Sequence, residues 1–290
     1  MLYCKDMRPS PHSASEQSHP QERQLPAAKT YPLFAFGSGA LVGVLGGLIG
    51  LGGAEFRLPV LVGWFHLPIL LSVVINLLVS LVTVIFSLFF RLPLQGATLW
   101  FSHWQVVLNL LIGSLCGSAY GAHLAGKTSA AKLKGIIALL LAFLGALLFA
   151  HEWLFAQNPL PLSPVGRLLL GIGAGFGIGL VSSLLGVAGG ELLIPTLALL
   201  FGIEIKLAGS LSLLVSLPTI LMGIWRYSRQ EIFTKLRRQL GLIFWMALGS
   251  ILGAYLGSRL LPYTPSIFLQ IFLGTILFIS AYRIWRSAAH

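Results

Sequence analysis

Two glutamates, Glu55 and Glu191, stand in the same unusual setting in a sequence that is poor in charge. Each ends a glycine-rich run within an apolar stretch, and each is followed four residues later by a proline, Pro59 or Pro195. Ionisable side chains in membrane-like segments are costly and usually serve a function. An ionised carboxylate repels an anion, whereas a protonated one donates a hydrogen bond to it. The pair therefore indicates a site where a small anion and protons bind together.

Glycines and prolines position these acids at the starts of two short helices. Gly52 and Gly53, and later Gly189 and Gly190, interrupt the apolar stretch. A proline is tolerated near the first turn of a helix, which indicates a new helix at each break. A helix start attracts anions through its unpaired N–H groups and dipole, and glycine lets a ligand approach the backbone closely. We expect these breaks to bind the substrate.

The setting occurs twice because the second half of the chain repeats the first at a constant offset of 136 residues. The matched positions are Gly39 with Gly175, Gly43 with Gly179, Gly50 with Gly186, Glu55 with Glu191, Pro59 with Pro195, Ser80 with Ser216, and Thr83 with Thr219. Matches of Gly, Pro, Glu, Ser and Thr at one offset indicate a duplication. We predict a disordered cytoplasmic tail over residues 1–31, a first transmembrane repeat over 32–156 and a second over 157–290.

Composition defines the class of protein. The chain of 290 residues is 56% hydrophobic and 9% charged, with a mean hydropathy of +0.88. Soluble domains carry roughly 25% charged residues, and a bilayer is crossed by about 20 apolar residues. We predict an all-α polytopic membrane protein with two homologous, inverted helical repeats and about 8–10 membrane segments, including two short broken helices.

The helices are expected in the same order in each half. A glycine-punctuated helix is followed by a short helix, two longer helices and a closing helix. The expected ranges are 34–51, 55–65, 69–90, 104–125 and 135–155 in the first half, and 168–187, 191–201, 207–225, 240–261 and 266–285 in the second.

Lys and Arg residues predict the orientation, because they are enriched in cytoplasmic loops. If each short helix returns to the side from which its predecessor came, 14 basic residues lie on the side of the termini and 4 lie opposite. The 4 are Arg91, Arg167, Lys206 and Arg259. Arg57 is left out of this count; if the short helices stay outside the membrane and Arg57 is counted, the split is 13 to 6. Both arrangements place the N- and C-termini in the cytoplasm.

Other polar residues are candidates for the transport path. Asn76, Ser80, Thr83, Ser212, Ser216 and Thr219 lie on the helices that follow the breaks. We expect them to line the path or to bond back to their own backbone. Arg57, whose counterpart is Leu193, could contact substrate, pair with Glu55 or Glu191, or extend to lipid headgroups. The glutamates themselves could instead cap the short helices.

The doubled motif resembles a known family. It reads Gly39, Gly43, Gly50, Gly52 and Gly53 before Pro59, and Gly175, Gly179, Gly186, Gly189 and Gly190 before Pro195. This pattern is similar to that of the TauE/SafE family of proposed sulfite and organosulfur exporters, also called toluene sulfonate uptake permeases. The resemblance spans about residues 34–285 and implies a bacterial inner-membrane transporter. Glu55 and Glu191 stand where the family usually has apolar residues, which indicates a subgroup with its own substrate or coupling.

The sequence therefore predicts a secondary transporter for a small anion such as sulfite, a sulfonate or another organosulfur or carboxylate compound, with proton coupling. A passive anion channel and a membrane assembly protein are the alternatives. No P-loop, hydrolase motif or metal-ligand spacing is present, so we predict no enzyme activity, catalytic residue, metal or cofactor. The net charge of +11 fits basic loops facing anionic lipid rather than nucleic acid.

Overall fold

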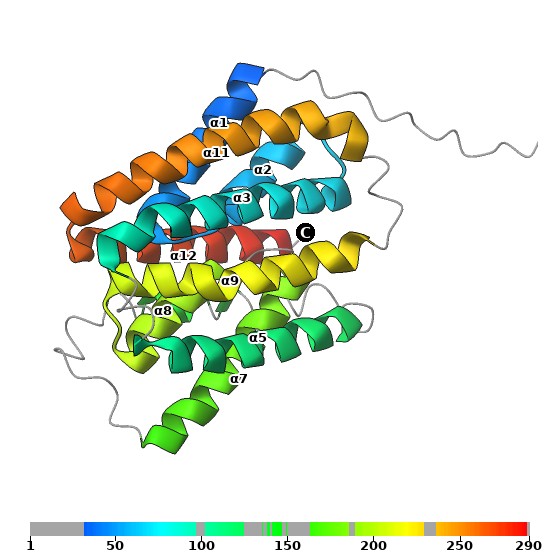
Figure 1. Ribbon diagram of the computed structural model, residues 1–290. Coiled ribbons are helices and arrows are strands. Elements are labelled where there is room, and N and C mark those ends of the chain that lie inside the picture. The colour runs from blue at the N-terminus through cyan, green and yellow to red at the C-terminus, as the bar shows by residue number, and fades with distance from the viewer. Residues whose placement is uncertain are drawn as a thin grey trace, which may run out of the picture.

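Every element that the computed structural model describes is a helix, which confirms the all-α class (Figure 1). The structure describes residues 32–96, 102–124, 135, 138–139, 141–146, 149, 163–185, 189–228 and 236–288. The α-helices are α1 (Pro32–Ile49), α2 (Ala54–Gly63), α3 (Ile69–Gln95), α5 (Trp104–Leu124), α7 (Pro164–Leu185), α8 (Gly190–Phe201), α9 (Ile205–Ser228), α11 (Leu240–Leu260) and α12 (Ser266–Ala288). Two short 3-10 helices, η1 (Arg237–Gln239) and η2 (Leu261–Tyr263), flank α11.

Six of the described helices are long and apolar enough to cross a membrane, which confirms the polytopic membrane class. The spans are Pro32–Ile49, Ile69–Leu94, Val165–Ser182, Ile205–Trp225, Arg237–Tyr263 and Ser266–Arg283. Trp104–Tyr120 and Gly190–Phe201 are shorter apolar segments. The predicted tail lies outside the described residues, and the predicted closing helix of the first half lies partly outside them.

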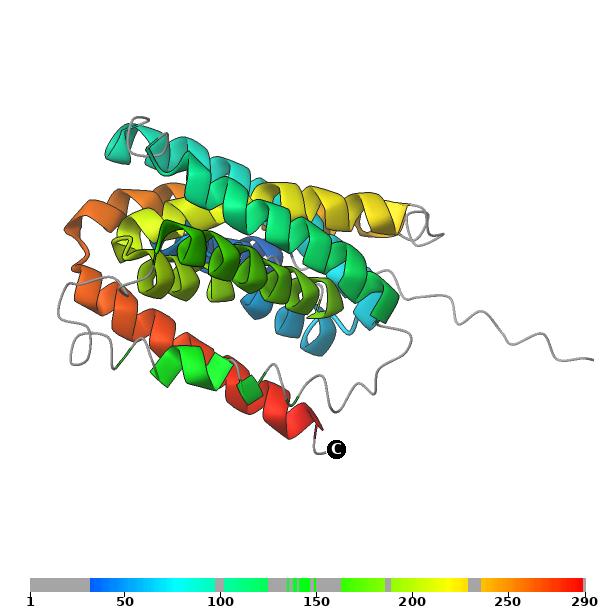
Figure 2. The same ribbon diagram turned by 90° about the horizontal axis from the view of Figure 1, so that it is seen from below.

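The order of elements recurs along the chain. The starts of α2, α3 and α5 at residues 54, 69 and 104 are followed by the starts of α8, α9 and α11 at residues 190, 205 and 240, each 136 positions later. Figures 1 and 2 show that α3 and α9 run in opposite directions, and that α5 and α11 do as well. Equivalent helices therefore point toward opposite ends of the bundle.

Glycines bring α1 and α11 into backbone contact. A Cβ added at Gly39 would collide with the backbone of Met246, and one at Gly43 with that of Ser250. From the other helix, Gly253 faces the backbone of Ala40 in the same way. The contacting residue numbers rise together in both helices, so α1 and α11 are parallel. Small residues allow this close approach of helices in lipid.

The pair α5 and α7 packs in the same manner. A Cβ at Gly175 would collide with the backbone of Leu110, and one at Gly179 with that of Ser114. Gly117 of α5 lies against the backbone of Phe176. The first long helix of each predicted half thus packs against the fourth helix of the other half, which interlocks the halves.

The breaks before α2 and α8 have matching backbones. Gly53 has φ 70° and Gly189 has φ 71°, the left-handed conformation that glycine adopts readily. Pro59 and Pro195 are each the sixth residue of their helices, one turn later than the predicted first-turn position. Because proline lacks an N–H, the backbone carbonyls of Glu55 and Glu191, four residues earlier, lose their usual i→i+4 partner.

Candidate functional site

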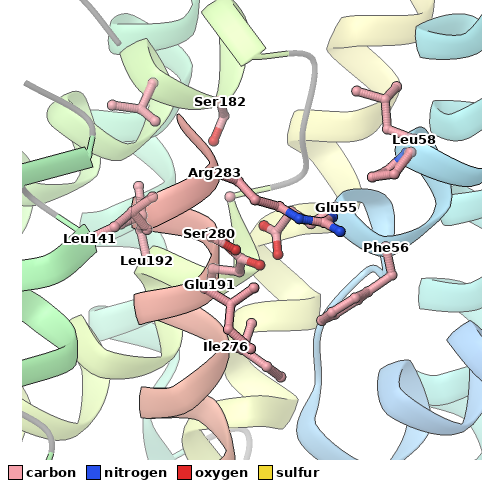
Figure 3. Close-up of a pocket in the computed structure, with 14 residues that line it drawn as sticks. Glu55, Phe56, Leu58, Leu141, Ser182, Glu191, Leu192, Ile276, Ser280 and Arg283 are labelled. Carbon is pink, nitrogen blue, oxygen red and sulfur yellow. The ribbon is translucent and has the colours of Figure 1, made fainter. Parts of the chain in front are cut away.

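Glu55 from α2 and Glu191 from α8 line one cavity of about 210 Å³ (Figure 3). Its walls come from α2, α7, the start of α8, α12 and Leu141. The lining residues are Glu55, Phe56, Leu58, Pro59, Leu141, Val181, Ser182, Gly189, Glu191, Leu192, Ile276, Ile279, Ser280 and Arg283. An apolar wall with a few converging polar groups is the usual make-up of a small-molecule site.

Both acids stand at the second residue of their helices, directly after the left-handed glycines. The N-cap residues Gly53 and Gly189 have no side chain of their own to cap α2 or α8. Glu191 is buried, with 4% of its surface exposed, and its Oε1 has no hydrogen-bond partner among the described residues. A buried carboxyl oxygen without a partner is costly, so this Oε1 does not cap α8 and is open to a proton.

Sequence reasoning missed three polar residues of this cavity, Ser182 from α7 and Ser280 and Arg283 from α12. Figure 3 shows Arg283 extending toward Glu55, while Ser280 lies beside Glu191. The Oγ of Ser182 is buried and has no partner in the described part of the chain. Arg283 was counted among the cytoplasmic loop cations because it lies near the end of the chain. The helical spacing of Ile276, Ser280 and Arg283 was the signal that places them on one face.

The acids lie deep in the bundle. The amide Nδ2 of Asn76 donates a hydrogen bond of 2.9 Å to the carbonyl of Ala54, which ties the start of α2 to α3 at about a quarter of its length. The next residues of α2 contact the middle of α3 through Arg57 and Ser80. Along α12 the cavity lining runs from Ile276 to Arg283, about 10 Å of helix. The cavity therefore extends from the middle of the bundle toward the end where α12 finishes.

Arg57 lies on the opposite face of α2 from the cavity and is fully buried. Its Nη1 donates to Ser80 at 2.9 Å and to Asn76 at 3.5 Å, and its Nη2 donates to Thr83 at 3.1 Å and to Ser250 at 3.3 Å. The pairing predicted with Glu55 or Glu191 is therefore wrong, because these four partners are neutral. Headgroup contact is also wrong, since the side chain has no exposed surface. Arg57 instead joins α2 to α3 and to α11.

The predicted path residues are buried but do not line the cavity. Asn76, Ser80 and Thr83 surround Arg57. Ser212 donates to the carbonyls of Gly50, at 2.9 Å, and Gly209, at 2.8 Å, so it secures the first break from α9.

The two threonines among the predicted path residues donate hydrogen bonds to backbone carbonyls of their own helices. Thr83 donates to Val79 and Thr219 to Val215, each at 2.9 Å. Ser216 is fully buried on the same helix as Thr219. The backbone alternative thus holds for both threonines.

The glycines predicted to bind substrate do not all lie at the cavity. Gly189 lines the cavity, whereas Gly52 and Gly53 are buried at the first break. A Cβ at Gly190 would lie 3.5 Å from the Cα of Leu51, so the two breaks abut. Gly186 lies outside the described residues.

Arg91 was interpreted as a loop cation, and this interpretation is wrong. It belongs to α3, is fully buried, and donates through Nε to the carbonyl of Gly47 and through Nη2 to that of Leu48, each at 2.9 Å. Its Nη1 donates to Ser210 of α9 at 2.8 Å. Arg91 therefore satisfies the carbonyls at the end of α1, where a cation is also favoured by the helix dipole.

A bundle of membrane-spanning helices with two abutting breaks and a central cavity defines the class of helical membrane transporters. The family model described as Sulfite exporter TauE/SafE matches residues 35–284, and the chain belongs to this family of membrane transporters. No curated protein and no solved structure matches the chain. Within the described residues, no cluster of three or more His, Cys, Asp or Glu side chains could hold a metal ion.

Proposed function

We propose that the protein is a secondary transporter that carries a small anion together with protons through the cavity between α2, α7, α8 and α12. One observation carries the proposal: the first-turn acids of both broken helices line the same cavity as Arg283. Two carboxyl groups from different parts of the chain and one cation meet where an anion and its protons can bind together.

The chemistry follows from charge. Arg283 attracts an oxyanion, whereas ionised Glu55 and Glu191 repel it. Protonation removes this repulsion and gives each acid an O–H that can donate to the anion. The serine hydroxyls of Ser182 and Ser280 supply further donors at the same cavity. Anion affinity and proton affinity thus increase together, with up to two protons for each anion, and this linkage is reciprocal.

The proposed transport cycle uses two inverted repeats, residues 32–156 and 157–290. The opposite directions of α3 and α9 and of α5 and α11 support this division. The cavity extends toward one end of the bundle, so a movement of the α1–α11 pair relative to the α5–α7 pair, each of which joins one helix from either repeat, would expose the acids to the other end. The parallel pairs α1 with α11 and α5 with α7 would move as rigid units.

We propose a bacterial inner membrane, with both termini cytoplasmic, as the location. The substrate class is a small oxyanion: sulfite, a sulfonate, or another organosulfur or carboxylate compound. The family description supports sulfite, and Arg283 beside hydroxyl donors suits any of these anions.

A passive anion channel is the second candidate, because the same cavity could conduct without titrating. The unpartnered Oε1 of Glu191 favours coupling over conduction, since it leaves an acceptor available for a proton.

The experiment is radiolabelled sulfite and sulfonate flux into proteoliposomes under an imposed pH gradient. The wild-type protein is compared with Glu55→Gln, Glu191→Gln and Arg283→Gln. A sodium gradient without a pH gradient is the control for the coupling ion. Arg286→Gln is the control variant, because Arg286 is an exposed cation of α12 outside the cavity.

The proposal predicts that the pH gradient drives flux and that both Gln variants of the acids lose this drive. Arg283→Gln should weaken the apparent affinity about tenfold or more, the typical effect of losing a charge-assisted hydrogen bond. Flux that ignores the gradient and survives both acid substitutions would support the channel. Absence of flux for every anion would support an assembly role instead.

A further inference from the structure

A cavity of about 490 Å³, the α3–α11 cavity, lies between the ends of two helices and shares no residue with the central cavity. Both α3 and α11 finish at the same end of the bundle (Figure 1). The rings of Phe90 and Tyr255 join them edge to face, with centroids 5.3 Å apart. The lining residues come from the last two turns of each helix and are Phe89, Phe90, Leu92, Pro93, Leu94, Tyr255, Ser258 and Arg259.

The position of this cavity along the helices places it at the level of the lipid headgroups. The apolar spans run over Ile69–Leu94 and Arg237–Tyr263, so the cavity lies where both spans finish. Tyr263 is 86% exposed just after α11, and exposed tyrosines concentrate at the membrane–water interface. Phe89, on the α3 wall, is 68% exposed. An acyl chain can therefore pack against this wall while its headgroup stays in the interface.

Arg259 gives the α3–α11 cavity a cation. Its guanidinium lies over the ring of Tyr255, 5.4 Å from the centroid. Within the described part of the chain it forms no hydrogen bond or ion pair, and no acid lines the cavity. A guanidinium has five N–H donors, and it binds phosphate oxygens through pairs of them. The cation is thus available to an anionic group beside the aromatic wall.

Ser258 adds a hydroxyl to the same cavity. The residue is fully buried, and its Oγ has no hydrogen-bond partner among the described residues. A hydroxyl can donate to a phosphate oxygen. The backbone carbonyls nearby are already engaged, because the N–H of Leu261 bonds to those of Gly257 and Ser258. The hydroxyl of Thr264 donates to the carbonyl of Leu260 at 2.9 Å. The cavity therefore offers an anion one cation and one hydroxyl donor.

We propose that the α3–α11 cavity binds one anionic phospholipid, with its phosphate at Arg259 and Ser258 and an acyl chain along Phe89 and Leu92. An apolar wall beside a cation matches this amphiphile, whereas a free inorganic anion would leave the wall uncovered. A symmetric second copy of the chain would bring another Arg259 to the same place, and like charges oppose that contact. The site is separate from the transport cavity, so its test does not depend on the proposed function.

The experiment measures lipid binding to the delipidated full-length protein in detergent by native mass spectrometry. Phosphatidylglycerol is compared with phosphatidylcholine of the same acyl chains. The variants are Arg259→Gln, Ser258→Ala and Phe89→Ser. Ser258→Ala removes only an unpartnered hydroxyl and Phe89 is exposed, so both variants should fold. Lys206→Gln is the matched control, because it removes a cation outside the cavity, at the start of α9, from the end of the bundle where α3 finishes.

We expect wild-type protein to bind phosphatidylglycerol about tenfold more tightly than phosphatidylcholine, and Arg259→Gln to lose this preference. Ser258→Ala should weaken phosphatidylglycerol binding about threefold or more, and Phe89→Ser should weaken the binding of both lipids. Lys206→Gln should leave the preference unchanged.

Three results would overturn the proposal. The first is equal affinity of wild-type protein and Arg259→Gln for phosphatidylglycerol. The second is displacement of this lipid by an equal concentration of inorganic phosphate, because the acyl chain would then contribute nothing. The third is a lipid-free dimer that Phe89→Ser converts to a monomer, because a second copy of the chain would then occupy the wall.

Discussion

At the scale of residues, five charged side chains of the bundle occupy two different environments. Glu55, Glu191 and Arg283 face a cavity. Arg57 and Arg91 are fully buried among neutral partners. In the proposed mechanism the first group exchanges ligands and protons, whereas the second forms hydrogen bonds that join helices. This distinction separates the proposed transport residues from structural ones, although both are charged residues in apolar segments.

Arg57→Lys should destabilise the protein. Lysine keeps the positive charge, but its single ammonium group cannot replace the two guanidinium nitrogens that donate to Ser80 and Thr83. We expect a loss of about 2 kcal/mol, seen as a lower midpoint of thermal unfolding in detergent. Arg283→Lys is the matched control, since Arg283 is exposed and should leave the midpoint unchanged. Equal midpoints for both variants would contradict the joining role of Arg57.

At the scale of elements, the positions of glycine residues determine which helices can pack in direct backbone contact. The interfaces between α1 and α11 and between α5 and α7 are formed by backbone against backbone. The left-handed glycines Gly53 and Gly189 then begin the short helices α2 and α8 inside the bundle. These features place the start of α2 beside α3 and bring both acids to one cavity.

Two glycines of α1 provide a matched test of this packing. Gly43→Ala should destabilise the protein by about 1–3 kcal/mol, because the added Cβ meets the backbone of Ser250. Gly37→Ala should be neutral or slightly stabilising, since nothing lies within 4 Å of its Cβ position. Thermal unfolding of the two variants measures the difference. A larger loss at Gly37 would show that α1 faces another direction.

A second prediction concerns the break itself. Gly189→Ala should impair transport more than Gly190→Ala. The former must adopt φ 71° and collides with Ser182 of the cavity, whereas a Cβ at Gly190 has only ordinary contacts. Sulfite flux at equal protein amounts is the measurement. Equal activity would mean that the backbone at the break can change freely.

Much of the element pattern was predictable, because apolar length and glycine spacing are local properties. The predicted start of α3 at Ile69 and that of α5 at Trp104 agree with the structure. The full cavity was not predictable, because Glu55 and Arg283 are brought together only by tertiary packing. The surroundings of Arg91 were predicted wrongly for a related reason. In the sequence, a cation near the end of an apolar helix shows the same pattern whether its side chain contacts lipid or the end of α1.

At the scale of the whole molecule, the central question is how the cavity communicates with the two sides of the membrane. Its lining extends along α12 toward Arg283, and from α7 it includes only Val181 and Ser182, near the end of that helix. Packed apolar side chains of α7 and α8, among them Ile178 and Leu197, close the bundle beyond this cavity. A transporter needs such an interruption, because an open route would dissipate the gradients.

Sidedness can be tested with single cysteines in a chain whose Cys4 and Cys116 have been replaced by serine. We predict that Trp285→Cys and Ser280→Cys react with a membrane-impermeant thiol reagent from the cytoplasmic side. Tyr263→Cys, at the opposite end of α12, should react from the other side. Labelling of Ser280→Cys and Tyr263→Cys from the same side would contradict the proposed opening of the cavity.

The most direct test of the central claim is proton movement driven by an anion gradient. An alkyl sulfonate is the best probe, because its charge does not titrate near neutral pH and any proton flux must come from the protein. Proteoliposomes containing a pH-sensitive dye receive an inward sulfonate gradient without an initial pH gradient. We predict that wild-type protein acidifies the lumen as sulfonate enters, and that the Glu55→Gln, Glu191→Gln double variant does not. Sulfonate uptake by wild-type protein without acidification would contradict the account.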